Sequence, residues 1–183
     1  MRDMSLHILD IAENSVRAEA TKVEILIDEG NISSFMIRDN GRGMDEETIK
    51  NALNPFYTTK TERKKKIGLG LPLLKQNVEL CDGKFKIESK PGEGTTVRWT
   101  VNTSHVDALP LGDIAETVWI LMTMYDTCDF IFSHRAKGKE TVIDSSEIKD
   151  AVGSDNLNKP ELSMIVRDYI REQENIIKNQ EAL

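Results

Sequence analysis

The 183-residue sequence predicts an α+β fold, a two-layer arrangement in which helices cover one face of a mixed or antiparallel sheet. Within the first hundred residues, helical and strand-like segments follow one another in the order αββααββ, without the strict alternation that a parallel sheet requires. After Val101 this order gives way to a connector, a helix, a hairpin and two further helices. We therefore expect one domain over residues 1–103 and a small C-terminal α/β region over residues 104–183.

Each element of the first domain has its own sequence signature. Residues 3–18 have helical spacing, and the acidic run after Met44 begins a short helix that ends before Pro55. A third helix begins near Leu71, and Gly83 is predicted to be its left-handed C-terminal cap. Strands are predicted where polar and apolar residues alternate, at 22–28, 34–39, 84–89 and 95–100.

The C-terminal region is expected to contain an apolar helix at 114–125, a hairpin and two final helices, the last of which begins at Pro160. The first of these helices is apolar on more than one face, which suits burial against the first domain or against a second protomer in a homodimer. The hairpin of residues 129–135 and 140–144 either extends the main sheet or belongs to a separate αββαα unit. Both placements stay open.

The bulk composition narrows the classes of function. The formal charge is −7 and the pI is about 5.1, which does not suit a general nucleic-acid surface. Cys81 and Cys128 lie far apart and indicate neither a disulfide framework nor a metal site. Because no apolar run reaches the ~20 residues of a membrane helix and no signal pattern follows Met1, we expect a soluble cytoplasmic protein without a membrane partner.

Two signals in the first half of the sequence suit ligand binding. On the first helix, a narrow polar stripe crosses an otherwise apolar surface, and buried polar groups of this kind need partners such as Mg²⁺ and phosphate. This stripe consists of His7, Asp10, Asn14 and Arg17. The run Asp39-Asn40-Gly41-Arg42-Gly43 lies where a strand ends, so its carboxylate can accept a hydrogen bond from an amine such as that of adenine. A solvated stripe and an ordinary turn are the alternative explanations.

Two further signals are rich in glycine. Gly68-Leu69-Gly70-Leu71 leads directly into a helix whose free N–H groups suit phosphate, and the basic loop before it adds positive charge. Gly92-Glu93-Gly94-Thr95 joins two strands. By themselves these signals are also explained by a flexible linker and by a hairpin turn. The order of all four signals along the chain is more specific than any one of them.

The segments LHILDIAENSVRA, DNGRGM, NPFYTTK, GLGL and GEGT, in this order and at these distances, resemble the boxes of the GHKL ATPase superfamily, which includes histidine kinases and DNA gyrase. The resemblance covers residues 4–101 and is strongest to the branch of histidine kinases and anti-sigma-factor kinases. It implies a histidine-kinase-like ATPase fold with ATP and Mg²⁺ as cofactors. The whole chain also resembles small ATP-binding proteins that are encoded beside iron-only hydrogenase in anaerobic bacteria.

The resemblance implies roles for individual residues. Asn14 would bind Mg²⁺, Asp39 would bind the adenine amino group, and Thr95 would support the adenine pocket through its hydroxyl. Asp10 stands where relatives often have a glutamate that orients or deprotonates the attacking group, and its shorter side chain is expected to slow hydrolysis. The remaining residues would shape the base pocket (Gly41, Gly43), belong to the lid motif (Phe56, Lys60, with a lid at 57–67) or contact phosphates (Gly68, Leu69, Gly70).

Three functions from different classes follow. Histidine kinases carry a helix pair with the phosphorylated histidine, and we expect no such pair before this domain, so the chain would act as a stand-alone kinase on a protein partner in trans. The second function is an ATP-sensing regulatory module with slow or no hydrolysis, associated with a redox-enzyme subunit such as a hydrogenase. The third is a structural subunit that does not use ATP, which the intact motifs disfavour.

Overall fold

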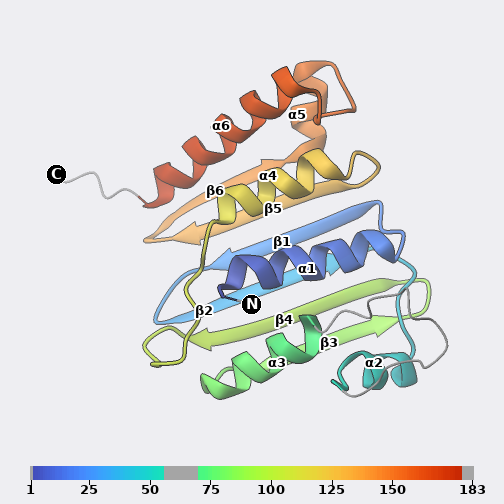
Figure 1. The fold of residues 1–183 in the computed structure, drawn as a ribbon, viewed down its shortest axis with the longest axis vertical. Helices are drawn as coiled ribbons and strands as arrows, with labels where there is room; N and C mark the ends of the chain where they lie inside the picture. The colour runs from blue at the N-terminus through green and yellow to red at the C-terminus, as the bar shows by residue number, and fades with distance from the viewer. Residues whose placement is uncertain (1, 56–69, 179–183) are drawn as a thin grey trace.

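The computed structural model describes residues 2–55 and 70–178, and these form two layers (Figure 1). Within the described residues, six strands form one mixed sheet in the order β3-β4-β2-β1-β5-β6. The strands are β1 (Lys22–Asp28), β2 (Ile32–Asp39), β3 (Phe85–Lys90), β4 (Gly94–Asn102), β5 (Asp129–Ala136) and β6 (Lys139–Asp144). The helices are α1 (Met4–Arg17), α2 (Glu46–Ala52), α3 (Gly70–Leu80), α4 (Ile114–Met124), α5 (Ser145–Val152) and α6 (Pro160–Lys178). The predicted α+β class is confirmed.

The core lies between the sheet and the helices that cover it. Alternate residues of the strands point inward, as in β1, where Val23, Ile25 and Ile27 are buried. The rings of Phe35 and Trp99 stack in this layer with their centroids 5.1 Å apart. Each large side chain that becomes fully buried contributes roughly 1.5–3 kcal/mol, so the inner face of the sheet fixes the position of α1 above it.

The C-terminal hairpin extends the main sheet, which resolves the choice that the sequence left open. β5 lies parallel to β1, and β6 lies antiparallel to β5. The helices α4 and α6 cover this extension on the same face as α1 and α3 (Figure 1). The division of the chain at residue 103 stays a prediction, and both of its parts contribute strands to one sheet.

The apolar helix α4 packs between α1 and α6. Its Trp119 donates a hydrogen bond from Nε1 to the carbonyl oxygen of Ser163 at 2.9 Å, and the guanidinium of Arg167 lies 5.0 Å from the ring centroid of the same tryptophan. The chain therefore buries this helix against its own elements. Among the helices of residues 2–55 and 70–178, none combines the length and the apolar character that crossing a membrane requires.

The end of α3 differs from the prediction. The left-handed residue is Asp82, with φ of 53°, and not Gly83. The glycine is needed for space, because a Cβ at this position would overlap the carbonyl oxygen of Thr100 in β4. The prediction of a left-handed glycine cap was therefore wrong, and close packing of the chain against β4 explains the glycine instead.

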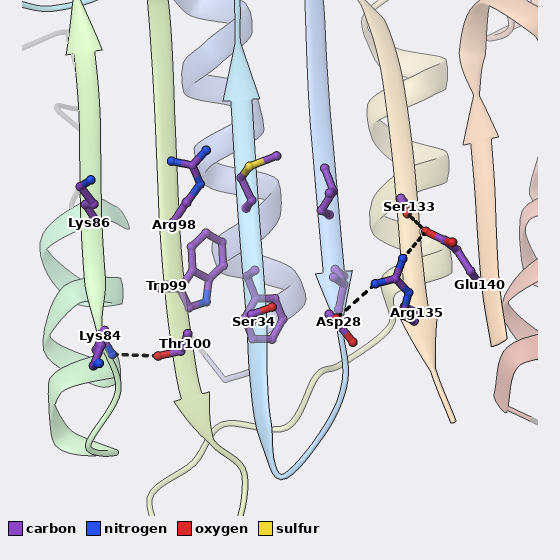
Figure 2. A pocket seen from close by; sticks show the side chains of 14 residues that line it. Asp28, Ser34, Lys84, Lys86, Arg98, Trp99, Thr100, Ser133, Arg135 and Glu140 are labelled. Atoms are coloured by element: carbon purple, nitrogen blue, oxygen red, sulfur yellow. Dashed lines mark hydrogen bonds and ion pairs between the residues drawn. The ribbon is translucent and has the colours of Figure 1, made fainter. Parts of the chain in front are cut away.

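The face of the sheet that points away from the helices has a hollow of about 350 Å³, which Figure 2 shows with the helices behind the sheet. Three of its charged side chains pair with one another: Arg135 lies 3.5 Å from Asp28 and 3.2 Å from Glu140, and Ser133 donates to Glu140 at 3.0 Å (Figure 2). None of the predicted site residues lines this hollow. We therefore interpret it as a solvated groove in the exposed face of the sheet.

A buried charged cluster joins α6 to the sheet. His134 on β5 is fully buried, and its Nδ1 lies 2.9 Å from Glu174 of α6, whereas its Nε2 lies 2.8 Å from Glu29. Because both neighbours are carboxylates, both ring nitrogens are donors and the ring is an imidazolium. Burial alone would lower the pKa of His134, but the hydrogen bonds to the two carboxylates outweigh this effect and raise the pKa to about 9.

The stability of the protein should fall as the pH rises from 6.5 through 9. The pKa of His134 is raised from 6.5 to about 9 by folding, so its contribution is fully present below pH 6.5 and is lost as the pH passes the folded value. We expect a loss of a few kcal/mol in the free energy of unfolding, measured by urea titration at both ends of this range. His134→Gln should be less stable at low pH and should lose most of this dependence. Equal pH slopes in the two proteins would contradict the assignment.

Candidate functional site

Three predicted motifs meet at one end of the sheet, where the last turn of α1, the end of β2 with the turn after it, and the start of β4 converge. The strand register brings them together, because Asp39 on β2 is opposite Val23 of β1 and Thr95 of β4. Figure 1 shows α2 and the turn that precedes it at the same end. Segments that are distant in the sequence therefore contribute to one site.

The carboxylate of Asp39 is the centre of this site. Asp39 is only 8% exposed, and its Oδ2 accepts a hydrogen bond from the hydroxyl of Ser15 at 2.7 Å. Its Oδ1 accepts from the N–H groups of Gly41 at 2.9 Å and Thr95 at 3.1 Å. A carboxylate offers about four acceptor positions, so these three donors leave one position for a further donor.

The turn after β2 is fixed on the α1 side by Asn40. The side-chain oxygen of Asn40 accepts from the N–H groups of Thr21 and Lys22, both at 2.9 Å. The N–H of Arg42 donates to the carbonyl of Ala18 at 2.9 Å. These bonds hold the Asp-Asn-Gly turn against the end of α1, so its backbone is fixed before any ligand binds.

The same turn is fixed on its other side by the β3–β4 hairpin. The N–H of Gly92 donates to the carbonyl of Arg42 at 2.7 Å, and the N–H of Met44 donates to the hydroxyl of Ser89 at 2.8 Å. Gly43 has a φ of 67°, and a Cβ there would overlap the carbonyl of Lys90. Only glycine fits this position, because both the backbone conformation and the available space exclude a side chain.

A chain of polar contacts follows the end of α1. The side-chain amide of Asn14 donates to the carboxylate of Asp10 at 3.4 Å, and Arg17 donates to the amide oxygen of Asn14 at 3.0 Å. Burial raises the pKa of Asp10, and the nearby Arg17 opposes this effect in part. The carboxylate of Asp10 also lies so close to Gly70 that a Cβ on Gly70 would overlap it. The glycine at the start of α3 is therefore in contact with the polar stripe of α1.

His7 lies in the part of α1 that is buried against α3, not in the site. Its Nε2 is 3.0 Å from the side-chain amide of Asn77, and its ring is fully buried. Burial lowers the pKa of His7 to about 4, so the ring is neutral at pH 7. The predicted polar stripe of α1 is therefore divided, since His7 contacts α3 whereas Asp10, Asn14 and Arg17 contact one another near the end of the helix.

The structure places seven of the eleven predicted site residues, namely Asp10, Asn14, Asp39, Gly41, Gly43, Gly70 and Thr95. The other four, Phe56, Lys60, Gly68 and Leu69, lie outside the described residues, as does the predicted lid at 57–67. Thr95 contacts Asp39 through its N–H, whereas its hydroxyl lies 2.8 Å from the hydroxyl of Ser89. Thr95 thus contacts Asp39 through its backbone, and the support of an adenine pocket by its hydroxyl stays a prediction.

Sequence reasoning missed Ser15, which binds the same carboxylate. Ser15 follows Asn14 directly, but it points toward the sheet and is buried. The signal for it was a serine on the apolar side of a largely buried helix, since such a hydroxyl needs a partner. The partner itself could not be identified from the sequence, because it lies 24 residues away.

Comparisons with known proteins identify the family of this chain. Residues 2–105 match the family described as histidine kinase-, DNA gyrase B-, and HSP90-like ATPase, and this segment is more than half of the chain. The fold and the match together define the class of the protein: the chain belongs to this ATPase family.

Histidine kinases are among the related proteins. The cell-division control histidine kinase PdhS of Brucella anthropi is 36% identical over 104 residues, which cover 49% of this chain and 10% of that kinase. The sensor histidine kinase YvrG of Bacillus subtilis is 33% identical over 82 residues, which cover 43% of this chain and 14% of that kinase. The chain thus matches only a small part of each kinase.

A solved structure supports the fold independently. The N-terminal domain of a DNA repair protein superimposes with a TM-score of 0.53 at 18% sequence identity, and the match covers 78% of this chain and 52% of that chain. At this identity the likeness concerns the fold alone.

Gly70→Ala should destabilise the protein, because the added methyl group would overlap the carboxylate of Asp10. We expect the free energy of unfolding to fall by about 1–3 kcal/mol. Asp10→Ala in the same chain should recover most of this loss, since it removes the overlapping atoms. Urea titration of the wild type, both single variants and the double variant measures the coupling. Simple additivity would show that the two residues are not in contact.

Proposed function

We propose that this chain binds Mg·ATP at the end of the sheet that carries Asp39 and transfers the terminal phosphate to a protein partner. The observation that supports this most is the buried carboxylate of Asp39, which accepts three hydrogen bonds and has one acceptor position left. The exocyclic amine of adenine is a donor that suits this position. Gly41 and Gly43 shape the backbone beside it, so the base would lie against the turn.

The phosphate end of the nucleotide would lie between α1 and the start of α3. Mg²⁺ prefers oxygen ligands and is usually held by one or two protein groups together with phosphates and water. The amide oxygen of Asn14 is such a ligand, and Arg17, which now donates to it at 3.0 Å, would turn toward the phosphates instead. By family resemblance, Gly68, Leu69 and Gly70 would bind phosphate oxygens, and Phe56 and Lys60 would close over them.

None of the three histidines of this sequence is placed to accept the phosphate, so we infer an acceptor outside residues 1–183. His7 and His134 are fully buried, so neither can attack a nucleotide without local unfolding. His105 follows the end of β4 that is remote from Thr95, and therefore lies at the opposite end of the sheet from the site. In the transfer, a nucleophile of the partner would bond to the terminal phosphorus as the bond to the ADP oxygen breaks.

Asp10 is the residue of this chain that we assign to positioning the attacking group, and it would accept its proton directly or through a water molecule. Its raised pKa suits proton acceptance, but its carboxylate is short and already contacts Asn14 and Gly70. This observation also supports a second candidate function, an ATP-sensing module with slow hydrolysis. The two functions differ in whether phosphate leaves the nucleotide.

Asp39→Asn should weaken ATP binding by about a hundredfold, because the amide oxygen can replace Oδ1 as the acceptor for Gly41 and Thr95, and the amide nitrogen then presents a donor where the adenine amine needs an acceptor. Asn14→Ala should remove most of the dependence of binding on Mg²⁺. Titration calorimetry with ATP, with and without Mg²⁺, measures both effects. Asp28→Asn on the exposed face of the sheet and Asn175→Ala on α6 are matched controls that should bind ATP like the wild type. If Asp39→Asn bound ATP with the affinity of the wild type, the assignment of the site would be wrong.

Asp10→Glu should increase the release of phosphate about tenfold or more, because the longer carboxylate reaches further toward the terminal phosphate. Asp10→Asn should bind ATP but release no phosphate, since the amide cannot accept the proton. A coupled assay for inorganic phosphate, with calorimetry on the same samples, measures both properties. Release that does not change in Asp10→Asn would remove Asp10 from the mechanism. Release that stays at background in the wild type would favour the sensor.

A further inference from the structure

The last helix, α6, has two apolar faces, although only one of them packs against the rest of the chain. The sequence predicts a single stripe of Leu162, Ile165, Val166, Tyr169 and Ile170. The structure divides it: Val166 and Ile170 are buried against α4 and the sheet, whereas Ile165 and Tyr169 point outward. The outer face carries four large apolar side chains, Met164 (69% exposed), Ile165 (59%), Tyr169 (40%) and Ile176 (51%).

The outer apolar residues have the spacing of a helix-pairing seam. Tyr169 follows Ile165 by four residues and Ile176 follows Tyr169 by seven, so the three side chains lie within about 40° of one another around the helix. Such a stripe packs best against one face of a second helix, because apolar side chains of that helix fit between its own.

The charges beside this stripe are acidic and unpaired. Glu161, Asp168 and Glu172 are exposed along one flank of the stripe, and among the described residues none of the three forms an ion pair. The basic residues of the same helix are already paired, Arg167 and Arg171 with Glu116, and Lys178 with Glu174. The outer face therefore presents apolar side chains with a row of free carboxylates.

The position of α6 keeps this surface apart from the ATPase site. α6 packs on α4, β5 and β6 at the side of the sheet opposite β3, and β6 is three places from β2, which carries Asp39 (Figure 1). A partner bound to the outer face of α6 would leave the end of α1 and the turn after β2 uncovered.

We propose that the outer face of α6 binds an amphipathic helix of a partner protein whose apolar stripe is flanked by lysine or arginine. Opposite charges beside a helix pair are favourable, and like charges are unfavourable by similar amounts. A second copy of this chain related by a two-fold axis would place Asp168 and Glu172 beside the same residues of the other copy, and an anionic membrane surface would also repel them. A basic helix is the occupant that these charges favour. This proposal does not depend on ATP binding.

Two synthetic helical peptides test the proposal with the full chain. Both carry leucine at the seam positions, and one has lysine and the other glutamate at the flanking positions. Fluorescence anisotropy should show binding of the lysine peptide and at least about tenfold weaker binding of the glutamate peptide, with a difference that shrinks at high salt. The double variant Asp168→Lys/Glu172→Lys should reverse this preference. The reversal cannot result from misfolding, because one of the two peptides would bind better than before.

Variants of the stripe supply the second part of the test. Ile165→Asp should lose binding of the lysine peptide, whereas Leu80→Asp, which changes an equally exposed apolar residue on α3, should retain it. Equal binding of both peptides, or no binding of either, would overturn the proposal. Sedimentation of the wild type as a dimer that Ile165→Asp dissociates would also overturn it, because the stripe would then be covered by a second copy. Binding to phosphatidylglycerol vesicles that Ile165→Asp abolishes would equally contradict a helical partner.

Discussion

The hydrogen bonds to the buried carboxylate of Asp39 hold together the end of the sheet at which we propose that ATP binds. A buried carboxylate costs several kcal/mol unless donors compensate for the water that it loses. Here the three donors come from α1, from the turn after β2 and from β4, so the charge is tolerated only when these elements meet. Because Ser15 and Thr95 both donate to this carboxylate, Asn14, which precedes Ser15, and the start of β4 both lie near the turn after β2. At the proposed adenine site, the hydrogen bond from Ser15 to Asp39 therefore also joins α1 to β2.

The second constraint is the edge of the sheet. Without the C-terminal hairpin, β1 would be an edge strand with an apolar inner face and a row of unpaired N–H and C=O groups. β5 pairs with β1 along its whole length and moves the edge to β6, a strand of six residues that carries Lys139, Glu140 and Asp144. The His134 cluster then ties this extension to α6. The C-terminal region thus completes the sheet as well as carrying its own surface.

Much of this fold could be predicted because its determinants are local. Periodicity and the signals of helix ends located every helix and strand that the structure describes before residue 103. The remainder depends on contacts between distant residues. The partner of Ser15 and the carboxylates beside His134 are brought close only by tertiary contacts between distant elements. A side chain is excluded at Gly83 only because β4 passes there. The sequence predicts one apolar stripe on α6. Only the position of α4 shows which of these apolar residues are buried and which are exposed.

The order of the helices relates the two proposed surfaces. α1 carries Asn14 and packs on α4, and α4 packs on α6 through Trp119 and through the ion pair of Glu116 with Arg167. The helix layer is therefore a continuous set of contacts from the proposed ATP site to the outer face of α6. Energetic coupling between two sites requires an element with two discrete arrangements in addition to such contacts. Without that element, partner and nucleotide bind independently. A partner on the outer face of α6 would therefore leave the proposed ATP site open for exchange of the nucleotide.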